Sequence, residues 1–240
     1  MSIFAGPEIV NNGLVLALDA GNSKSYPGSG TTWFDLSGNG GNGTLLNGVG
    51  YSSNNNGILT FDGTNDYVDL GVSYFISTSI PFTITVWFNG NWRTTGNQFH
   101  RIITLRASGT PTLGIAYCTV RTAGYLGLYF GANSGWVNAT SDKLVDTGTW
   151  NSVTLTYNGL GSTTAGNFKM YLNTTLLPLI TTGLTPPAAL EDKNFLAVRT
   201  SSGEVQIFNG SIPTTYVFNR ELTETEVLQN FNALRGRFGI

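Results

Sequence analysis

The sequence predicts an all-β domain built from two packed antiparallel sheets, with one short helix near its C-terminal end. Glycine accounts for 31 of the 240 residues, nearly twice its usual share of about 7%. Charged residues make up 11% of the chain, against roughly a quarter in an average soluble domain. Strand-like runs separated by turn residues recur along the whole length. A helical bundle would need far more Ala, Glu, Lys and Leu.

The strand-like runs show the alternation that is expected of half-buried strands. In residues 82–88, four large apolar residues alternate with Thr83, Thr85 and Trp87. A period of two is typical of an antiparallel strand that packs one face on a core. Ten or more such runs without intervening helices predict two packed sheets. The expected strands are residues 14–18, 57–61, 67–70, 82–88, 100–105, 113–120, 125–130, 150–157, 167–172, 195–199 and 215–218.

One helix is expected close to the C-terminal end. Thr223 is a suitable N-cap residue, and Glu226 lies three residues later, as in a capping box. Arg235 falls in the last turn, and Gly236 fits a left-handed helix stop. The apolar stripe of this helix consists of Val227, Leu228, Phe231 and Leu234.

The chain reads as one domain between two short terminal segments. No linker rich in Pro or Ser and no internal repeat divides it. We therefore expect an N-terminal arm over residues 1–12, a single domain over residues 13–234 and a C-terminal tail over residues 235–240. Termini of this kind are candidate docking elements, because they stay loose unless something holds them.

Charge and composition exclude several classes of protein. The formal net charge is −2 and the isoelectric point about 5.3, so no basic field exists to bind nucleic acid or an anionic membrane. No apolar run approaches the roughly 20 residues of a membrane-spanning helix. The opening residues lack the basic and apolar regions of a secretory signal, and the single cysteine, Cys118, can form no internal disulfide. We expect synthesis in a reducing cytoplasm.

The residues offer little for catalysis. His100 is the only histidine, and it lies in a strand-like segment without a nucleophile elbow, so a Ser-His-Asp or Cys-His site is disfavoured. A zinc site with two or three histidine ligands is excluded. Asp66 and Asp69, like Glu191 and Asp192, would point to opposite faces of an extended chain, so no carboxylate pair of a glycosidase marks a cleft. The sequence predicts a protein that is not an enzyme.

A first loop carries oxygen-bearing side chains at alternate positions. Asp35, Ser37 and Asn39 precede Gly40, a pattern that opens an oxygen-ligand calcium loop. The twelfth position is Leu46, so the closing acidic ligand is missing. The other interpretation is a turn whose side chains bind their own backbone.

A second loop contains Asp62, Asn65 and Asp66 between two strand-like runs. It has two interpretations: a hairpin turn, or half of a calcium site completed by a distant loop such as that of Glu191 and Asp192. Ca²⁺ is thus the one cofactor that the residues suggest, and neither loop requires it.

Three tryptophans are candidates for carbohydrate binding. Trp33, Trp92 and Trp136 lie outside the clear strand faces, where an exposed ring can stack on a sugar. Each can equally be buried by a loop. The glycan-binding prediction therefore depends on their exposure.

An ordered set of segments spans nearly the whole chain. The segments are residues 13–20, 33–40, 61–68, 82–87, 150–157, 169–173, 208–212 and 216–223. Together they resemble the laminin-G-like, concanavalin A-like jelly-roll domains, over roughly residues 12–234. The resemblance implies an antiparallel jelly-roll β-sandwich of the lectin and glucanase type. Members often carry Asp-Glu where this chain has Pro213 and Thr214, which weakens any transferred metal or catalytic role there.

The two ends of the chain give the resemblance a biological setting. Residues 6–10 and 226–240 resemble versions of the domain found in tailed bacteriophages. This implies a non-enzymatic virion protein, assembled in the host bacterial cytoplasm and displayed as a capsid decoration or a tail appendage. Its partners would be other virion proteins, and further copies of itself are compatible with this role. The alternative is a carbohydrate-binding module for host-surface or environmental glycans, assisted by calcium.

Overall fold

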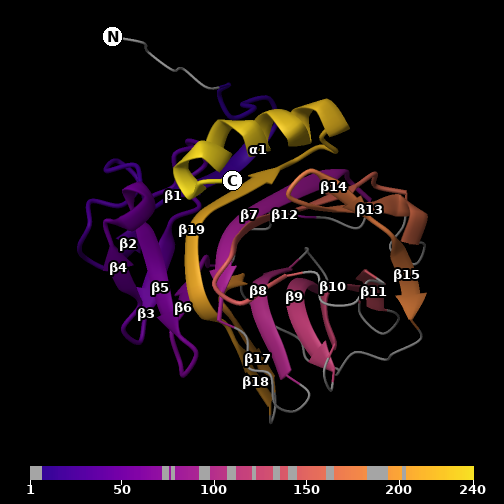
Figure 1. Ribbon diagram of the computed structural model, residues 1–240. Helices are drawn as coiled ribbons and strands as arrows, with labels where there is room; N and C mark the ends of the chain where they lie inside the picture. Colours follow the sequence, from indigo (N-terminus) through magenta and orange to yellow (C-terminus); the bar gives the residue numbers. More distant parts are fainter. Residues whose placement is uncertain are drawn as a thin grey trace.

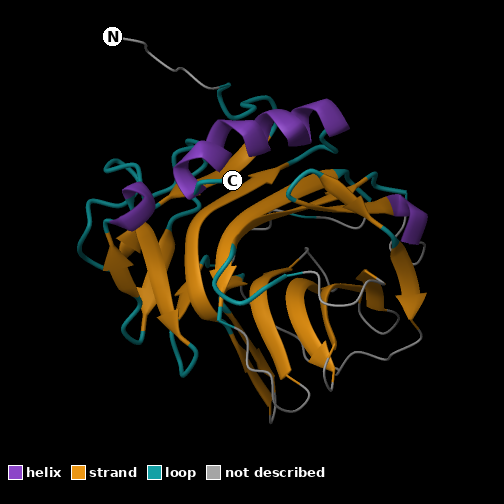
Figure 2. Cartoon of the chain, viewed as in Figure 1, coloured by secondary structure: helices purple, strands orange, loops and turns teal. Residues whose placement is uncertain are grey.

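The chain folds as two antiparallel sheets packed face to face, with a helix against the outer side of one of them (Figure 1, Figure 2). The all-β, two-sheet jelly-roll prediction with a C-terminal helix is therefore confirmed. The computed structural model describes residues 7–71, 76, 79–91, 98–106, 112–120, 123–131, 136–139, 145–160, 165–182, 194–201 and 204–240.

Sheet A has eight strands and bears the helix. Its strands follow the order β14 (Thr175–Leu177), β13 (Phe168–Leu172), β12 (Trp150–Tyr157), β7 (Phe82–Gly90), β19 (Asn209–Phe218), β5 (Ile58–Asp62) and β4 (Gly50–Ser52), and β1 (Leu14–Asp19) also pairs with β19. Two 3₁₀ turns, η1 (Asn54–Asn56) and η2 (Ala165–Asn167), lie in its connections.

Sheet B has nine strands and faces sheet A across the main core. Its strands follow the order β15 (Leu179–Thr182), β11 (Trp136–Ala139), β10 (Ala123–Gly131), β9 (Thr112–Val120), β8 (Gln98–Arg106), β16 (Phe195–Leu196), β6 (Tyr67–Asp69), β3 (Gly43–Leu46) and β2 (Thr32–Trp33). A separate hairpin of β17 (Val198–Ser201) and β18 (Glu204–Ile207) contacts β8.

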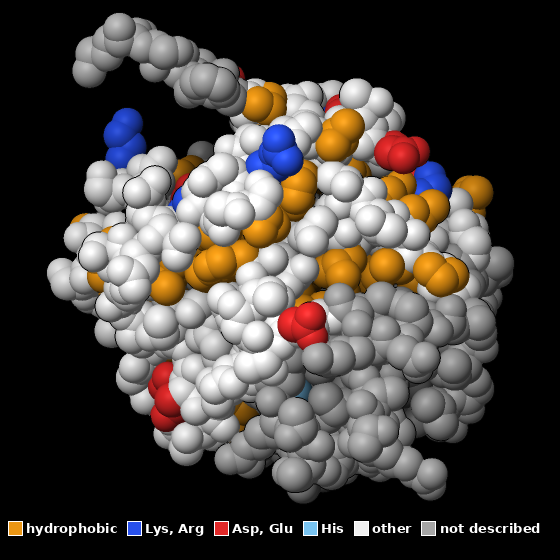
Figure 3. All heavy atoms as spheres, viewed as in Figure 1, with side chains coloured by type: hydrophobic (Ala, Val, Ile, Leu, Met, Phe, Trp, Pro, Cys, Tyr) orange, Lys and Arg blue, Asp and Glu red, His pale blue; other side chains and the backbone are white. Residues whose placement is uncertain are grey.

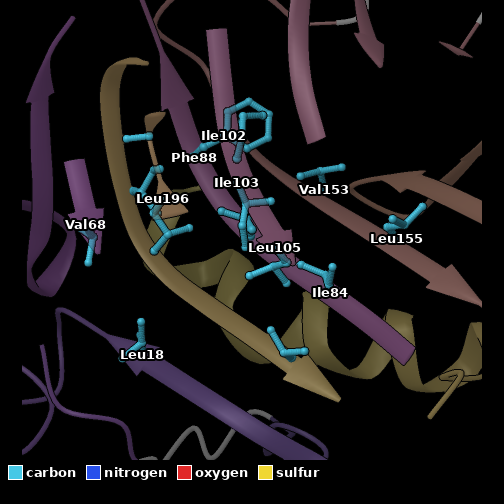
Figure 4. Packing of buried hydrophobic residues seen from close by; sticks show 14 of the residues in the cluster. Leu18, Val68, Ile84, Phe88, Ile102, Ile103, Leu105, Val153, Leu155 and Leu196 are labelled. Carbon is cyan, nitrogen blue, oxygen red and sulfur yellow. The ribbon is translucent and has the colours of Figure 1, made fainter. Parts of the chain in front are cut away.

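The main core lies between the two sheets (Figure 4). Most of its side chains come from alternate positions of the long strands, as the period of two predicts. The adjacent Ile102 and Ile103 both belong to it, at the register shift in β8. Burial of this apolar surface is the main force that holds the sheets together. Fully buried members from both sheets include Ile84, Phe88, Val153 and Leu155 of sheet A, and Val68, Ile102, Ile103 and Leu105 of sheet B.

A second apolar layer seals the outer face of sheet A beneath α1 (Glu224–Phe238). Trp87 of β7 has no exposed surface, and its ring stacks on Phe231 and Phe238 of the helix at 5.4 and 4.5 Å between ring centroids. The middle of β7 is therefore buried on both faces. The expectation of a single buried face is wrong here, because α1 covers the other.

The ends of α1 agree with the prediction at one end and differ at the other. Thr223 and Glu226 form the predicted capping box. The helix continues beyond Gly236 and stops at Gly239, which takes the left-handed conformation. Phe238 is buried, so residues 235–238 belong to the packed fold and not to a free tail. Leu228, expected in the apolar stripe, is 45% exposed.

Arg237 fastens the last turn of α1 to sheet A. Its guanidinium forms an ion pair with Asp19 at 2.7 Å and donates hydrogen bonds to the carbonyl oxygens of Asn55 and Gly57. The fork of donors in arginine suits several acceptors at once. Arg237, which lies in the segment expected as a C-terminal tail, is thus bound within the chain.

The described part of the N-terminal arm, residues 7–12, also lies against α1. The amide of Val10 donates to Oδ1 of Asn230 at 2.8 Å, and Nε2 of Gln229 donates to the carbonyl of Glu8 at 2.8 Å. Residues 8–10 are therefore held against the middle of α1, at Gln229 and Asn230. Within the described ranges, no helix combines the length and the apolar character needed to cross a membrane.

Candidate functional site

The loop of Asp35 is a turn that covers the free edge of β1. Oδ1 of Asp35 accepts hydrogen bonds from the amides of Ala17 and Ser37 at 2.8 and 2.9 Å. Oδ2 accepts from the hydroxyl of Ser37 at 2.6 Å and from the amide of Gly41 at 3.1 Å. Nδ2 of Asn39 donates to the Ser37 hydroxyl at 3.0 Å. The carboxylate already accepts four hydrogen bonds, so these residues fit the turn interpretation and do not fit a calcium ion.

The loop of Asp62 and Asp66 is also held by its own backbone. Oδ1 of Asp62 accepts from the amide of Thr64 at 2.7 Å, and more loosely from that of Asn65. These bonds lower the pKa of the Asp62 carboxyl. Oδ2 of Asp66 accepts from the amide of Asp62 at 3.0 Å. Burial, with a smaller contribution from the nearby Asp62 carboxylate, raises the pKa of Asp66.

The structure keeps these two loops apart. Asp35 binds Ala17, which pairs with Tyr216 of β19, whereas Asp62 pairs with Asn209 of the same strand. Seven residues of strand separate these two points on β19, which is roughly 20 Å. The loops therefore cannot share one ion.

Calcium at the second loop stays a prediction. Glu191 and Asp192, named as its completing ligands, lie outside the described residues. Among the residues that are described, no group of three or more His, Cys, Asp or Glu side chains could hold a metal ion.

Of the three tryptophans expected to bind carbohydrate, one is ruled out. Trp33 has no exposed surface and lies in the main core, so its ring cannot stack on a sugar. That prediction is wrong because the ring packs into the main core. Trp92 lies outside the described residues, and Trp136 is placed in β11 by its backbone.

Several titratable groups of the described residues are buried or paired with one another. His100 lies in β8 and is 4% exposed. Asp66, the close neighbour of Asp62, is also 4% exposed, so the two do not form a carboxylate pair across an open groove. Three further acids form ion pairs with basic side chains, namely Asp19 with Arg237 at 2.7 Å, Glu221 with Lys169 at 3.0 Å and Glu226 with Arg220 at 2.6 Å.

A row of side chains crosses the outer face of sheet A where the cover of α1 ends. Trp150 of β12 pairs with Asn89 of β7, and Asn89 pairs with Ser211 of β19. Ser211 pairs in turn with Thr60 of β5. Paired residues of antiparallel strands point to the same side, and the adjacent Phe88 points into the main core, so the row faces outward. We call these four residues the Trp150 row.

The Trp150 row is partly exposed, and much of its hydrogen-bonding capacity is unused. The hydroxyls of Thr60 and Ser211 make no hydrogen bond to the described residues, and Asn89 uses only Nδ2, which donates to the carbonyl of Gly148 at 2.9 Å. The Trp150 ring rests on Phe238 with 4.7 Å between ring centroids. The last turn of α1 therefore fixes an accessible aromatic ring at one end of a polar row.

Among the described residues, few charged side chains lie near the Trp150 row. Asp62 lies two residues beyond Thr60 on the same strand and is exposed. At the other end, Asp146 is exposed in the loop that leads to Trp150. Figure 3 shows that charged side chains are sparse on the described surface in this view, while hydrophobic side chains gather along α1 and the sheet below it. The row itself is neutral.

The sequence contained a signal for the Trp150 row that the tryptophan criterion missed. The strand predicted over residues 150–157 alternates, with Val153, Leu155 and Tyr157 on the core side. Extending that alternation backwards places Trp150 on the polar side. The neighbours of Trp150 in the row were not predictable in this way, because they come from strands far apart in the chain.

Comparison with known proteins supports the fold. The model of a family described as the concanavalin A-like lectin/glucanases superfamily, Laminin_G_3, matches residues 62–228. No curated protein sequence matches the chain.

Solved structures resemble the chain at low sequence identity. A Trypanosoma rangeli sialidase has a TM-score of 0.65 at 15% identity, covering 98% of this chain and 36% of its own. A botulinum neurotoxin type C structure, whose title links cell entry to two ganglioside molecules, has a TM-score of 0.62 at 18% identity, covering 94% and 52%. The binding domain of Paraclostridial Mosquitocidal Protein 1 has a TM-score of 0.59 at 14% identity, covering 93% and 52%. The chain thus spans about half or less of these structures, and the likeness shows the fold alone.

Proposed function

The chain belongs to the concanavalin A-like lectin/glucanase superfamily, and we propose that it is a non-enzymatic binding protein on the surface of a tailed-phage virion. In this role it is a capsid decoration or a tail appendage that docks on other virion proteins and adheres to its surroundings. The family fold serves enzymes and binding domains alike. The choice between an enzyme and a binding protein therefore depends on the side chains of this chain.

The observation that carries the proposal is the contrast between the acids and the Trp150 row. The carboxylates of the three ion pairs are bound to basic side chains, and those of Asp35 and Asp62 are bound to backbone amides. These contacts suit a structural role. The Trp150 row presents neutral polar groups and an aromatic ring that are accessible and mostly unused. Such a surface suits binding without bond cleavage.

The phage setting is supported by the two ends of the chain. The opening and closing segments are those whose sequences resemble tailed-phage versions of the domain. In the structure the described part of the N-terminal arm, residues 7–12, lies against α1, joined by the hydrogen bonds of Val10 and Gln229. These segments form one outer surface, which we expect to adjoin the neighbouring virion protein.

The test compares purified particles with and without the gene for this chain by cryo-electron microscopy. We expect density for a β-sandwich on the capsid or tail of the parent particle and its loss from the deletion particle. Particles with identical density everywhere would contradict the virion role.

The alternative is a carbohydrate-binding module that acts on host-surface or environmental glycans outside a virion. It is favoured by the Trp150 row, and the ganglioside interaction of the botulinum neurotoxin type C gives a precedent on this fold. A glycan array probed with and without calcium separates the two. Binding on the array together with absence from particles would select the alternative.

A further inference from the structure

We propose that the Trp150 row is a binding site for an uncharged carbohydrate chain that lies across the strands of sheet A. This inference rests on the proposed function as a binding protein and names its ligand class and its site. Neither the sequence candidates nor the family match assigns a role to these four residues.

The spacing of the Trp150 row suits a chain of repeating polar units. The strands β5, β19, β7 and β12 are neighbours in sheet A (Figure 1). Neighbouring strands lie about 4.8 Å apart, so the four paired positions form an evenly stepped line across them. A ligand that crosses the strands meets one side chain at each step. A polysaccharide presents hydroxyl groups at regular intervals along its length and matches this arrangement.

The chemistry of the row matches sugar hydroxyls. The hydroxyls of Thr60 and Ser211 can each donate and accept, and Oδ1 of Asn89 can accept. Since the two hydroxyls make no bond to the described residues, a ligand can replace their water without breaking hydrogen bonds within the protein. Orientation by a few polar groups of this kind is typical of small-ligand sites.

Trp150 provides the apolar part of the site. Its ring is partly exposed and is supported from the helix side by Phe238. Aromatic rings offer a large contact surface at little entropic cost, and Trp also carries an N–H donor. The apolar face of a sugar ring can therefore lie on Trp150 while its hydroxyls face the polar part of the row.

The exposed carboxylate of Asp62, two residues beyond Thr60 on β5, disfavours acidic ligands. Backbone hydrogen bonds, first of all from the amide of Thr64, hold the pKa of Asp62 below the usual range. Asp62 therefore stays ionised at neutral pH. A uronic or sialic acid chain would meet this like charge, whereas a neutral chain would not.

The test is native gel electrophoresis of the full chain in gels that contain dextran, laminarin or polygalacturonate. We expect retardation by at least one of the two neutral polysaccharides and none by polygalacturonate. Trp150→Ala should weaken that binding about tenfold or more. Retardation by polygalacturonate alone, by neither neutral polymer, or to the same degree in Trp150→Ala would overturn the proposal.

Conservative variants guard against a folding defect in Trp150→Ala. Thr60→Val and Ser211→Ala remove one hydroxyl each, and each should weaken neutral-polysaccharide binding about two- to tenfold. Thr175→Val, an exposed threonine on edge strand β14, is the matched control and should bind like the wild type. Equal binding by all three variants would contradict the site.

Asp62→Asn tests the charge selection. Binding of neutral polysaccharide should stay unchanged, while weak retardation by polygalacturonate should appear. No gain of acidic binding would refute the role of Asp62. If instead the row joins two copies of the chain, a dimer that Trp150→Ala abolishes will form without polysaccharide, which overturns the carbohydrate proposal. Failure in the gels with β-sandwich density still present on particles refutes this inference and leaves the virion role intact.

Discussion

The outer face of sheet A is buried along one part of its strands and partly exposed along another. Under α1, Trp87 is fully buried and stacks on two helix phenylalanines. Two residues further along β7, Asn89 is partly exposed in the Trp150 row. The strand conformation is the same at both positions. The cover of the helix therefore decides which part of the face is core and which part is available for binding.

Threonines show the same contrast at the level of single groups. Thr83, beneath the start of α1, donates to the carbonyl of Arg220 and accepts from the amide of Leu222, both at 2.9 Å. Thr60, in the Trp150 row, makes no side-chain hydrogen bond to the described residues. A buried hydroxyl needs partners within the protein, whereas an exposed one can keep its capacity for water or a ligand.

The largest effect is expected from removing the ring that joins helix and sheet. Trp87→Ala should lower the free energy of unfolding by about 3–5 kcal/mol, because the cavity lies in a packed layer. Urea unfolding followed by circular dichroism measures this. Leu228→Ala, on the exposed side of the same helix, is the control and should change it by less than about 0.5 kcal/mol. Similar losses in both variants would mean that α1 does not seal the sheet as described.

A smaller loss is expected where the helix is fastened at its end. Arg237→Met should lower the free energy of unfolding by about 2–3 kcal/mol, because Asp19 and two carbonyl oxygens lose their donor. The exposed Arg235 on the same turn gives the control variant Arg235→Met. Thermal unfolding of the two variants measures the difference in stability, and equal unfolding midpoints would contradict the role of Arg237.

Thr83→Val should cost about 1–3 kcal/mol, because the carbonyl of Arg220 and the amide of Leu222 would be left buried and unpaired. The same substitution at Thr60 should stay within about 0.5 kcal/mol of the wild type. Urea midpoints of the two variants give the comparison directly. A costly Thr60→Val would show that the Trp150 row is part of the packed structure.

The smallest effect concerns pH and the start of α1. Hydrogen bonding to Arg220 lowers the pKa of Glu226 from 4.5 to about 2. The stabilising contribution of this carboxylate is therefore fully present above about pH 4.5 and is lost as the pH falls toward 2. Glu226→Gln keeps the capping pattern but should lower stability at pH 6 by less than about 1 kcal/mol. The difference between the two proteins should shrink as unfolding is measured at successively lower pH, and a constant difference would speak against the pair.

Local patterns predicted the long elements well. The strand expected over residues 150–157 has the same bounds in the structure, and the capping box of Thr223 and Glu226 is present. The short strands β2, β3, β4 and β14 were not predicted. Each has two to four residues and is defined by its pairing with a distant strand more than by its own pattern.

The candidate site was the hardest part to predict. Trp33 and Trp150 are the same residue type in similar strand ends, yet one is buried in the core and the other lies on the surface. Asp35 carries a pattern shared by turns and calcium loops, and only the positions of Ala17 and Gly41 show that its carboxylate is already occupied. Exposure and occupancy depend on neighbours that no local window contains.

The sequence by itself determined the alternating strands, the start of the helix and the family fold, because these follow from the spacing of residues within one segment. The tertiary structure decided that β7 is buried on both faces, that Val10 packs on α1, and that Trp150, Asn89, Ser211 and Thr60 stand in one row. The members of the Trp150 row come from strands up to 151 positions apart, as for Thr60 and Ser211, and Val10 and Asn230 are 220 positions apart. Only the folded chain brings such residues side by side. Whether each of them is buried or exposed then depends on the elements that pack over it.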